Sequence, residues 1–436
     1  MKNILLFGAG KSASVLITYL INNATDNSWH IIIVDTNKSL IEQKTKLHPS
    51  STAIEANITN DILRVELIKN CDLVISMMPP FLHILIAKDC IVYSKHLLTA
   101  SYADEQIKLL AEKVKSKGII FLYEMGLDPG IDHMSAMQLI NNIKAKGGQI
   151  KSFKSHCGGL VAPKSNNNPW HYKISWNPQN VVLAGKAGAA YLADGQHITE
   201  KYEQLFNSHR TINTNDDSIG TLSYYPNRDS IPYINLYNLP TAHTFIRTTL
   251  RYSQFMQGWH TIIQLKLTEQ EVCYQSDDMS LADFFSAHFL KHEIALNLSL
   301  PDLERLQYLG LYDNNTIINK GYISAAEGLQ FALEKKLMLL PTDIDMIIMQ
   351  HEIIYEWQNK QVEHTASLIV YGSDGTHTAM ATTVGLPLGI AAKLILNETI
   401  KDAGLLLPTK ANIYEPVLKE LALHNICFTE DVVISD

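Results

Sequence analysis

The chain has 436 residues, which exceeds the ~250–300 residues over which one hydrophobic core usually grows, so we expect two or three domains. The formal net charge of −8 and the lack of a Lys/Arg-rich run argue against nucleic acid as a partner. The five cysteines are scattered and never spaced as CxxC, which indicates reduced thiols, a cytoplasmic location and no bound metal. The apolar runs are too short to predict a signal peptide or a membrane span.

Residues 2–124 alternate between apolar runs and segments with helical spacing. The runs NILLFGA, HIIIVD, DLVISMM and GIIFLYE read as buried strands, and a helical pattern follows each of them. Strands that are apolar throughout are typical of a parallel sheet that helices cover on both faces. The predicted fold class is therefore α/β, with a Rossmann-type doubly wound parallel sheet in this part of the chain.

The rest of the chain has a different texture. Residues 128–266 mix aromatic and polar alternation with many turns, which predicts a mixed α+β domain. Residues 267–361, including DIDMIIMQHEIIYEWQ, have helical spacing and predict a small helical domain. The last helix and strand are expected to return to the first sheet. The predicted domains are 1–127 with 385–436, 128–266 with 362–384, and 267–361.

The segment GAGKSA lies between the first predicted strand and a helix. Gly8 allows the tight turn, Gly10 allows close approach of a pyrophosphate, and Ala13 is small enough for the helix to pack on the strand. Lys11 and Ser12 lie in the same turn, at a helix N-terminus that would face the anion. The segment predicts dinucleotide binding, although a purely structural turn is the alternative.

Asp35 ends the second predicted strand, HIIIVD. A carboxylate at this position can accept hydrogen bonds from both ribose hydroxyls and would repel a 2′-phosphate, which favours NAD over NADP. Asp35 could instead cap the helix that follows. Lys38 nearby keeps NADP as an alternative.

Two further loops follow strands and so are expected at the carboxyl edge of the sheet, where such folds bind ligands. SMMPPFLH brings Met77, Met78 and Pro79 as possible cofactor contacts, with packing as the alternative for the methionines, and a structural role is favoured for its histidine, His83. TASY brings hydroxyl groups that could bind a carboxylate or the nicotinamide, although Ser101 or Tyr102 could instead cap a helix. The predicted cofactor contacts are completed by Ser101, Leu127 and Asp128.

EMGLDPGIDHM, residues 124–134, is unusually rich in special residues for a turn between a strand and a helix. Gly126 and Gly130 would let the backbone approach a bound ring, and Pro129 stiffens the turn. Asp128 would point a carboxylate at the ligand. Asp132 is interpreted as a possible cap of the next helix.

In the predicted second domain, four basic residues are candidate carboxylate ligands, because arginine binds carboxylates with two parallel hydrogen bonds. They are Lys173, Arg228, Arg247 and Arg251. Cys157 precedes a glycine pair, and an inert buried thiol is its alternative role.

Taken together, several of these motifs resemble the saccharopine dehydrogenase family. The resemblance is carried by EMGLDPGIDHM, SHCGGLVAPKSNNNPWHYKISWNP, YPNRDSIPY, RTTLRY and TAMATTVGLPLGIAAKLIL, which extend over nearly the whole chain. It implies a Rossmann domain completed by the C-terminal segment, a substrate domain used to form a homodimer, and a small helical domain.

The resemblance also implies an activity. This is NAD(P)-dependent oxidation of the C–N bond of saccharopine to L-glutamate and L-2-aminoadipate 6-semialdehyde, or the reverse condensation, in lysine metabolism. The implied substrate-binding residues are Ser101, Tyr102, Asp128, Cys157, Arg228 and Thr249. Tyr102, Asp128 and Cys157 are the candidates for moving a proton. A carboxynorspermidine-type synthase and a non-catalytic dinucleotide sensor are the alternatives.

Overall fold

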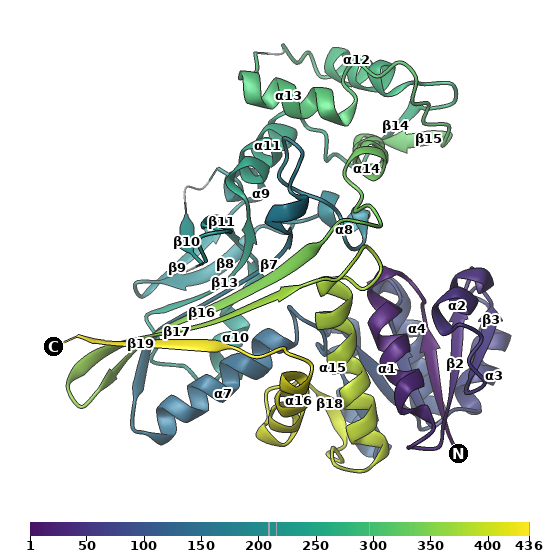
Figure 1. The fold of residues 1–436 in the computed structure, drawn as a ribbon, viewed down its shortest axis with the longest axis vertical. Helices are drawn as coiled ribbons and strands as arrows, with labels where there is room; N and C mark the ends of the chain where they lie inside the picture. Colours follow the sequence, from purple (N-terminus) through teal and green to yellow (C-terminus); the bar gives the residue numbers. More distant parts are fainter. Residues whose placement is uncertain (208–209, 215, 296, 436) are drawn as a thin grey trace. The chain divides into compact units, whose positions relative to one another are not determined.

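The computed structural model describes residues 1–207, 210–214, 216–295 and 297–435 (Figure 1). The chain forms two compact units. Unit 1 comprises Met1–Gln149 and Thr376–Thr429, and unit 2 comprises Ile150–Gly375 and Glu430–Asp436. The finer division into three domains stays a prediction.

Unit 1 is built on a parallel sheet, and this confirms the predicted doubly wound α/β class. The strand order is β18-β6-β5-β4-β1-β2-β3. All of them pair in parallel, and apolar runs such as β1, β4 and β6 are largely buried, as expected for a sheet that helices cover on both faces. Their bounds are β1 Lys2–Phe7, β2 Trp29–Asp35, β3 Ser51–Glu55, β4 Leu73–Ser76, β5 His96–Thr99, β6 Ile120–Leu122 and β18 Gly404–Leu406.

The helices of unit 1 connect these strands, and side chains of Asn37, Asn60, Asp104 and Thr378 cap four of them. The C-terminal segment returns to this sheet only in part. β18 pairs in parallel with β6, but the last strand, β19 Thr429–Ser435, pairs with β17 in the sheet of unit 2, so the expectation for that strand was wrong. The helices are α1 Ser14–Ala24, α2 Lys38–Thr45, α3 Asp61–Lys69, α4 His83–Val92, α5 Glu105–Lys108, α6 Ala111–Ser116, α7 Ile131–Ala145, α15 Ala379–Leu396 and α16 Ala411–Leu423, with short 3₁₀ turns η1 Lys11–Ala13 and η2 Pro80–Leu82.

Helix α15 is, among the described residues, the one helix long and apolar enough to cross a membrane by length and composition. In unit 1 it lies beside α1 (Figure 1), and 72% of it is buried. A Cβ added at Gly385 would lie 2.8 Å from the backbone nitrogen of Leu16, and one at Gly389 would meet the ring of Tyr19. The two glycines therefore permit the close packing of a core helix.

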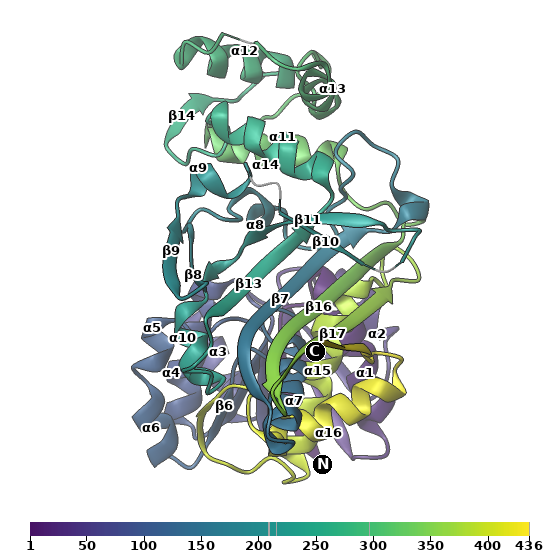
Figure 2. The same cartoon turned by 90° about the vertical axis from the view of Figure 1, so that its left-hand side faces the viewer.

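Unit 2 contains a mixed sheet in the order β10-β11-β13-β7-β16-β17-β19, with β8, β9 and β12 attached beside β13. Figure 2 shows β13, β7, β16 and β17 running side by side. The strands are β7 Gln149–Val161, β8 Ala189–Ala193, β9 Gln196–Glu200, β10 Thr211–Asn213, β11 Thr221–Pro226, β12 Arg228–Asp229, β13 Thr244–Arg251, β16 Asp345–Trp357, β17 Lys360–Tyr371 and β19 Thr429–Ser435.

The prediction of helix for DIDMIIMQHEIIYEWQ was wrong. This segment forms β16, which pairs with β17 along its whole length. Gln358 and Asn359 have φ of 52° and 61°, the left-handed conformation that a two-residue hairpin turn requires. The Ile- and Tyr-rich run therefore has a partner strand of matching length, and long-range pairing overrides the helical spacing.

Helices of unit 2 pack around an aromatic core, and α12, α13 and α14 fall inside the predicted helical range 267–361, whose status as a separate domain stays a prediction. Trp170, Phe255 and Trp259 are fully or almost fully buried there, and the rings of Phe255 and Trp259 stack at 5.2 Å. The remaining elements of unit 2 are η3 Pro163–Ser165, α8 Pro178–Val182, α9 Tyr202–Leu205, α10 Ile231–Leu236, α11 Ser253–Gln264, β14 Val272–Gln275, α12 Leu281–Lys291, α13 Leu300–Leu309, β15 Tyr322–Ser324 and α14 Ala325–Lys336.

Candidate active site

The glycine turn between β1 and η1 has the geometry that a pyrophosphate needs. Gly8 has φ of +98°, and a Cβ there would lie 3.0 Å from the carbonyl oxygen of Met77. A Cβ at Gly10 would meet no heavy atom of the described residues within 4 Å, so the space above the turn is open. Gly10 is also the N-cap residue of η1, and no side chain there accepts a hydrogen bond from the first N–H groups of the turn. The turn fits a dinucleotide, because an uncapped helix start binds anions.

Asp35 contacts the glycine turn directly. Its Oδ2 accepts a hydrogen bond from the backbone N–H of Ala9 at 2.7 Å, and its Oδ1 accepts one from the N–H of Asn37 at 3.1 Å. The alternative role as a helix cap is wrong, because Asn37 caps α2 by accepting from Leu40 N–H. Both oxygens of Asp35 thus already have backbone donors.

Lys44, which sequence reasoning missed, reaches the same turn from α2. Its Nζ donates to the carbonyl oxygen of Gly10 at 2.5 Å. Burial lowers the pKa of Lys44 to about 8, and the nearby Asp35 carboxylate acts in the opposite direction. A cation therefore lies next to the carboxylate on which the preference for NAD was based. No motif marks Lys44, because a lysine inside an amphipathic helix usually faces solvent.

His83 connects the ends of two strands. Its Nδ1 is 2.9 Å from Ser76 Oγ at the end of β4, and its Nε2 is 2.8 Å from Ser101 Oγ just after β5. His83 is 2% exposed, and burial lowers its pKa to about 4, with Asp104 opposing the shift. A neutral imidazole therefore holds the hydroxyl of Ser101, a predicted ligand contact.

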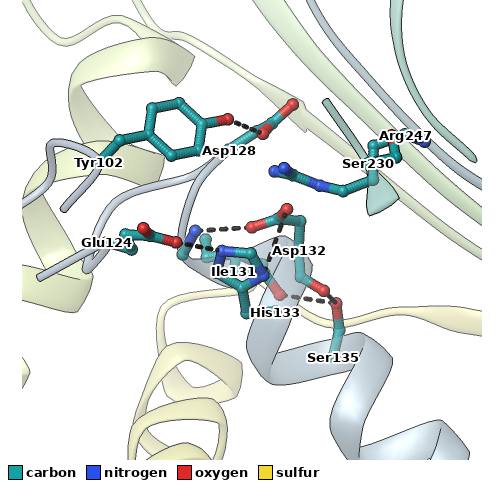
Figure 3. Close-up of polar contacts among 10 residues, drawn as sticks. Tyr102, Glu124, Asp128, Ile131, Asp132, His133, Ser135, Ser230 and Arg247 are labelled. Atoms are coloured by element: carbon teal, nitrogen blue, oxygen red, sulfur yellow. Dashed lines mark hydrogen bonds and ion pairs between the residues drawn. The ribbon is translucent and has the colours of Figure 1, made fainter. Parts of the chain in front are cut away.

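Tyr102 and Asp128, from two different loops, are in direct contact. The hydroxyl of Tyr102 donates to Asp128 Oδ1 at 3.1 Å (Figure 3). Gly130 has φ of +147°, and a Cβ there would lie 2.1 Å from the carbonyl oxygen of Gly126. The glycines of this loop are thus needed for the loop to close on itself, which is a different reason from the expected approach to a bound ring.

Behind Asp128 lies a group of buried polar side chains, of which sequence reasoning assigned only Asp132, as a possible helix cap. Asp132 Oδ1 accepts a hydrogen bond from Gly130 N–H at 2.6 Å at the start of α7. Glu124 Oε2 and His133 Nε2 are 2.8 Å apart, and both side chains are almost fully buried (Figure 3). Both residues lie inside EMGLDPGIDHM, so the density of polar residues in that segment was the available signal.

In unit 2, two predicted substrate residues are neighbours in the sheet. Cys157 on β7 is the register partner of Thr249 on β13, and Cys157 is buried. Lys173 is buried and its Nζ lies 2.7 Å from Asp343 Oδ1, so its charge already has a counter-ion. Arg228 is exposed and has φ of 56°, at the start of β12.

Arg251 is a buried cation that lacks a carboxylate partner among the described residues. Its side chain is 5% exposed, and Nη1 donates to the carbonyl oxygen of Leu250 at 2.8 Å. The guanidinium lies 5.3 Å from the ring centre of Tyr172 and 5.5 Å from that of Phe255. Its Nε has no hydrogen-bond partner within the described part of the chain. A buried charge in this state is costly unless an anion binds to it.

Within the described ranges, no group of three or more His, Cys, Asp or Glu side chains is arranged so that it could hold a metal ion.

The parallel sheet, the glycine turn and the polar loops at the carboxyl edge of the strands define a dinucleotide-binding domain of the Rossmann type. The chain belongs to the saccharopine dehydrogenase family, as its motifs predicted. The family's NADP binding domain matches residues 4–122, and its C-terminal domain matches residues 126–426.

Individual relatives match over nearly the full chain. The chain is 32% identical over 442 residues to saccharopine dehydrogenase [NADP(+), L-glutamate-forming] of Saccharomyces cerevisiae, covering 96% of each protein. It is 33% identical to alpha-aminoadipic semialdehyde synthase of Arabidopsis thaliana over 87% of this chain, but it spans only 38% of that longer protein. The solved structure of apo saccharopine dehydrogenase (L-Glu forming) from Saccharomyces cerevisiae matches with a TM-score of 0.85 at 30% identity, covering 99% of this chain and 100% of that one.

The buried state of His83 predicts a pH dependence of stability. The unfolded chain binds a proton at a histidine below about pH 6.5, whereas native His83 binds one only below about 4. The unfolded state thus holds more protons between these values, and the free energy of unfolding should fall by roughly 3 kcal/mol as the pH drops through this window. Urea unfolding of wild type and His83→Gln at several pH values measures this. The variant should lose stability less steeply, and equal slopes would contradict the assignment.

Proposed function

We propose that this protein oxidises saccharopine, releasing L-glutamate and L-2-aminoadipate 6-semialdehyde. The observation that carries the proposal is the end-to-end likeness to fungal enzymes named saccharopine dehydrogenase [NADP(+), L-glutamate-forming], of which the chain covers 96–99%. The reaction removes a hydride from the carbon that bears the secondary amine and a proton from the nitrogen. Water then adds to the resulting C=N bond and splits it into the amino acid and the aldehyde.

The chain's own residues would bind the substrate and move its proton, and a bound dinucleotide would supply the hydride acceptor. We assign the amine proton to the Tyr102 and Asp128 pair. Because the hydroxyl of Tyr102 donates to Asp128 Oδ1, the carboxylate is an acceptor that can orient an N–H group. Ser101, held by His83, is proposed as a neighbouring polar contact. Cys157 remains the alternative proton carrier.

We propose NADP as the preferred cofactor, against the expectation from Asp35 alone. The family's NADP binding domain covers residues 4–122. Asp35 Oδ2 accepts from Ala9 N–H, and Lys44 offsets the charge of this carboxylate beside the turn. The repulsion that Asp35 would exert on a 2′-phosphate is therefore weakened, and Lys11 and Lys44 are the proposed cations for that phosphate.

A substrate panel tests the proposal. Purified protein is given saccharopine with NADP⁺ or NAD⁺, reduced cofactor is followed by absorbance, and glutamate is quantified. We expect turnover of saccharopine, with a kcat/KM at least about tenfold higher for NADP⁺, because one charge contact with the 2′-phosphate contributes on the order of 1.4 kcal/mol. Carboxynorspermidine serves as the comparison substrate. Preferential turnover of that amine, or no glutamate release from saccharopine, would refute the proposal.

Saccharopine carries three carboxylates, and we propose that Arg251 binds one of them. The support for this role is its burial together with the unused Nε and the missing counter-ion within the described ranges. A bound carboxylate would compensate the charge and accept from the guanidinium through two oxygens. Arg305 offers a matched comparison. It is equally buried, but its Nη1 lies 2.7 Å from Asp302 Oδ1.

Replacing Arg251 should therefore separate activity from stability. Arg251→Met should lower kcat/KM for saccharopine by about 10- to 100-fold, which corresponds to the free energy of one hydrogen bond to a charged group. The same change should raise the melting temperature, because an uncompensated buried charge disappears. Arg305→Met should do the reverse and lower the melting temperature while kcat/KM is unchanged. Steady-state kinetics and thermal unfolding of both variants decide this, and a loss of stability without loss of kcat/KM in Arg251→Met would contradict the role.

We further propose a homodimer in the cytoplasm. The edge strand β19 carries Val432, Val433 and Ile434, each about half exposed, and such an apolar edge is a surface on which a second copy can pair. The five free thiols support a reducing compartment. Sedimentation should give twice the chain mass at micromolar concentration, and Val433→Asp should shift it toward the monomer. A monomeric wild type would contradict this assembly.

A further inference from the structure

The side chains of Tyr102 and Asp128 come from separate loops, so their contact depends on how these loops are held. Tyr102 follows β5, and Asp128 lies between β6 and α7. Their hydrogen bond is 3.1 Å long, within the range where a shift of the loops by a fraction of an ångström weakens it. Whatever fixes the two loops therefore also fixes this pair.

Glu124 contacts both flanks of Tyr102. Its backbone N–H donates to the carbonyl oxygen of Ser101 at 3.1 Å. Its side-chain Oε1 accepts from the backbone N–H of Ala103 at 3.2 Å. Tyr102 is thus held between two hydrogen bonds to a single residue.

The other oxygen of Glu124 connects to the loop of Asp128. Oε2 lies 2.8 Å from Nε2 of His133, in the first turn of α7. His133 Nδ1 lies 3.7 Å from Asp132 Oδ2, and Asp132 Oδ1 in turn accepts from Gly130 N–H. This chain of contacts runs from Ala103 to the end of the Asp128 loop, as Figure 3 shows for its side chains.

The backbone conformation and the burial of Glu124 both point to a role in fixing geometry. Its φ of 59° is in the left-handed region that non-glycine residues rarely adopt, and such backbones are kept where the surrounding contacts determine them. Its side chain is 5% exposed and that of His133 is fully buried. Buried pairs of this kind contribute little net stability compared with apolar side chains, so a role in fixing geometry accounts for them better.

We propose that Glu124 and His133 form a positioning pair that sets the Tyr102 to Asp128 hydrogen bond. Neither residue is assigned contact with substrate. The kinetic part of this inference rests on the proposed saccharopine oxidation, whereas the structural part does not. Glu124→Gln keeps the size of the side chain and an oxygen for Ala103, but it weakens the contact to His133.

The kinetic test is a double-mutant cycle. Glu124→Gln and His133→Gln should each lower kcat for saccharopine by about 10- to 100-fold, the typical effect of a small misplacement, with little change in KM or in the Kd of NADPH. Added to Tyr102→Phe, Glu124→Gln should have almost no further effect, because its target is already gone. Losses that multiply would overturn the proposal.

A matched control accounts for loss of stability. Asp89 pairs with buried Arg64 at 2.7 Å in the same unit. Asp89→Asn should lower the melting temperature as much as Glu124→Gln while kcat stays unchanged. An equal loss of kcat in both variants would mean that general destabilisation, not positioning, explains the effect.

A spectroscopic readout is independent of the substrate. In the ¹³C NMR spectrum of protein labelled with ¹³Cζ-tyrosine, the signal that is lost in Tyr102→Phe belongs to Tyr102. The Asp128→Asn variant gives the chemical shift of this signal when the carboxylate partner is absent. Glu124→Gln should move the signal toward that position, and Asp89→Asn should not. An unmoved signal in both Glu124→Gln and His133→Gln overturns the inference. A wild type that is inactive on saccharopine refutes only the proposed function, because the NMR result stands apart from it.

Discussion

The direction of the strands in unit 1 is the constraint on which its candidate site depends. Parallel strands all end at the same edge of a sheet, so the loops after β1, β4, β5 and β6 start from one line. Contacts between these loops confirm this proximity. Met77 O lies 3.0 Å from the Cβ position of Gly8, and His83 joins the end of β4 to Ser101. The chemistry of the site is distributed over more than a hundred residues, but the sheet brings it together.

The features of unit 1 that depend only on short segments of the chain could be predicted from the sequence. Apolar strands, the glycine turn and polar residues directly after strands all refer to short segments whose place in the sheet follows from their order. The contact between Tyr102 and Asp128 was implicit, because both were placed at one edge. Their mutual hydrogen bond was not, since it depends on how two loops close.

The failures have a common physical cause, because each depends on a partner distant in sequence. The run DIDMIIMQHEIIYEWQ has helical spacing, but β17 pairs with its residues 346–357 and makes it a strand. The preference for NAD was inferred from Asp35 alone, whereas Lys44 from α2 places an opposing charge beside that carboxylate. A motif describes a residue by its neighbours in the chain, whereas hydrogen bonds and charges are set by neighbours in space.

Buried charges distinguish structural from binding residues more clearly than residue type does. Lys173 and Arg251 were both expected to bind carboxylates, and both are buried. Lys173 has Asp343 at 2.7 Å, so a substrate carboxylate would have to compete with an internal one. Arg251 has two aromatic rings and a carbonyl oxygen, but no carboxylate within the described ranges, so its desolvation is uncompensated in the free protein. A ligand carboxylate would supply the missing opposite charge, and this makes Arg251 the stronger candidate.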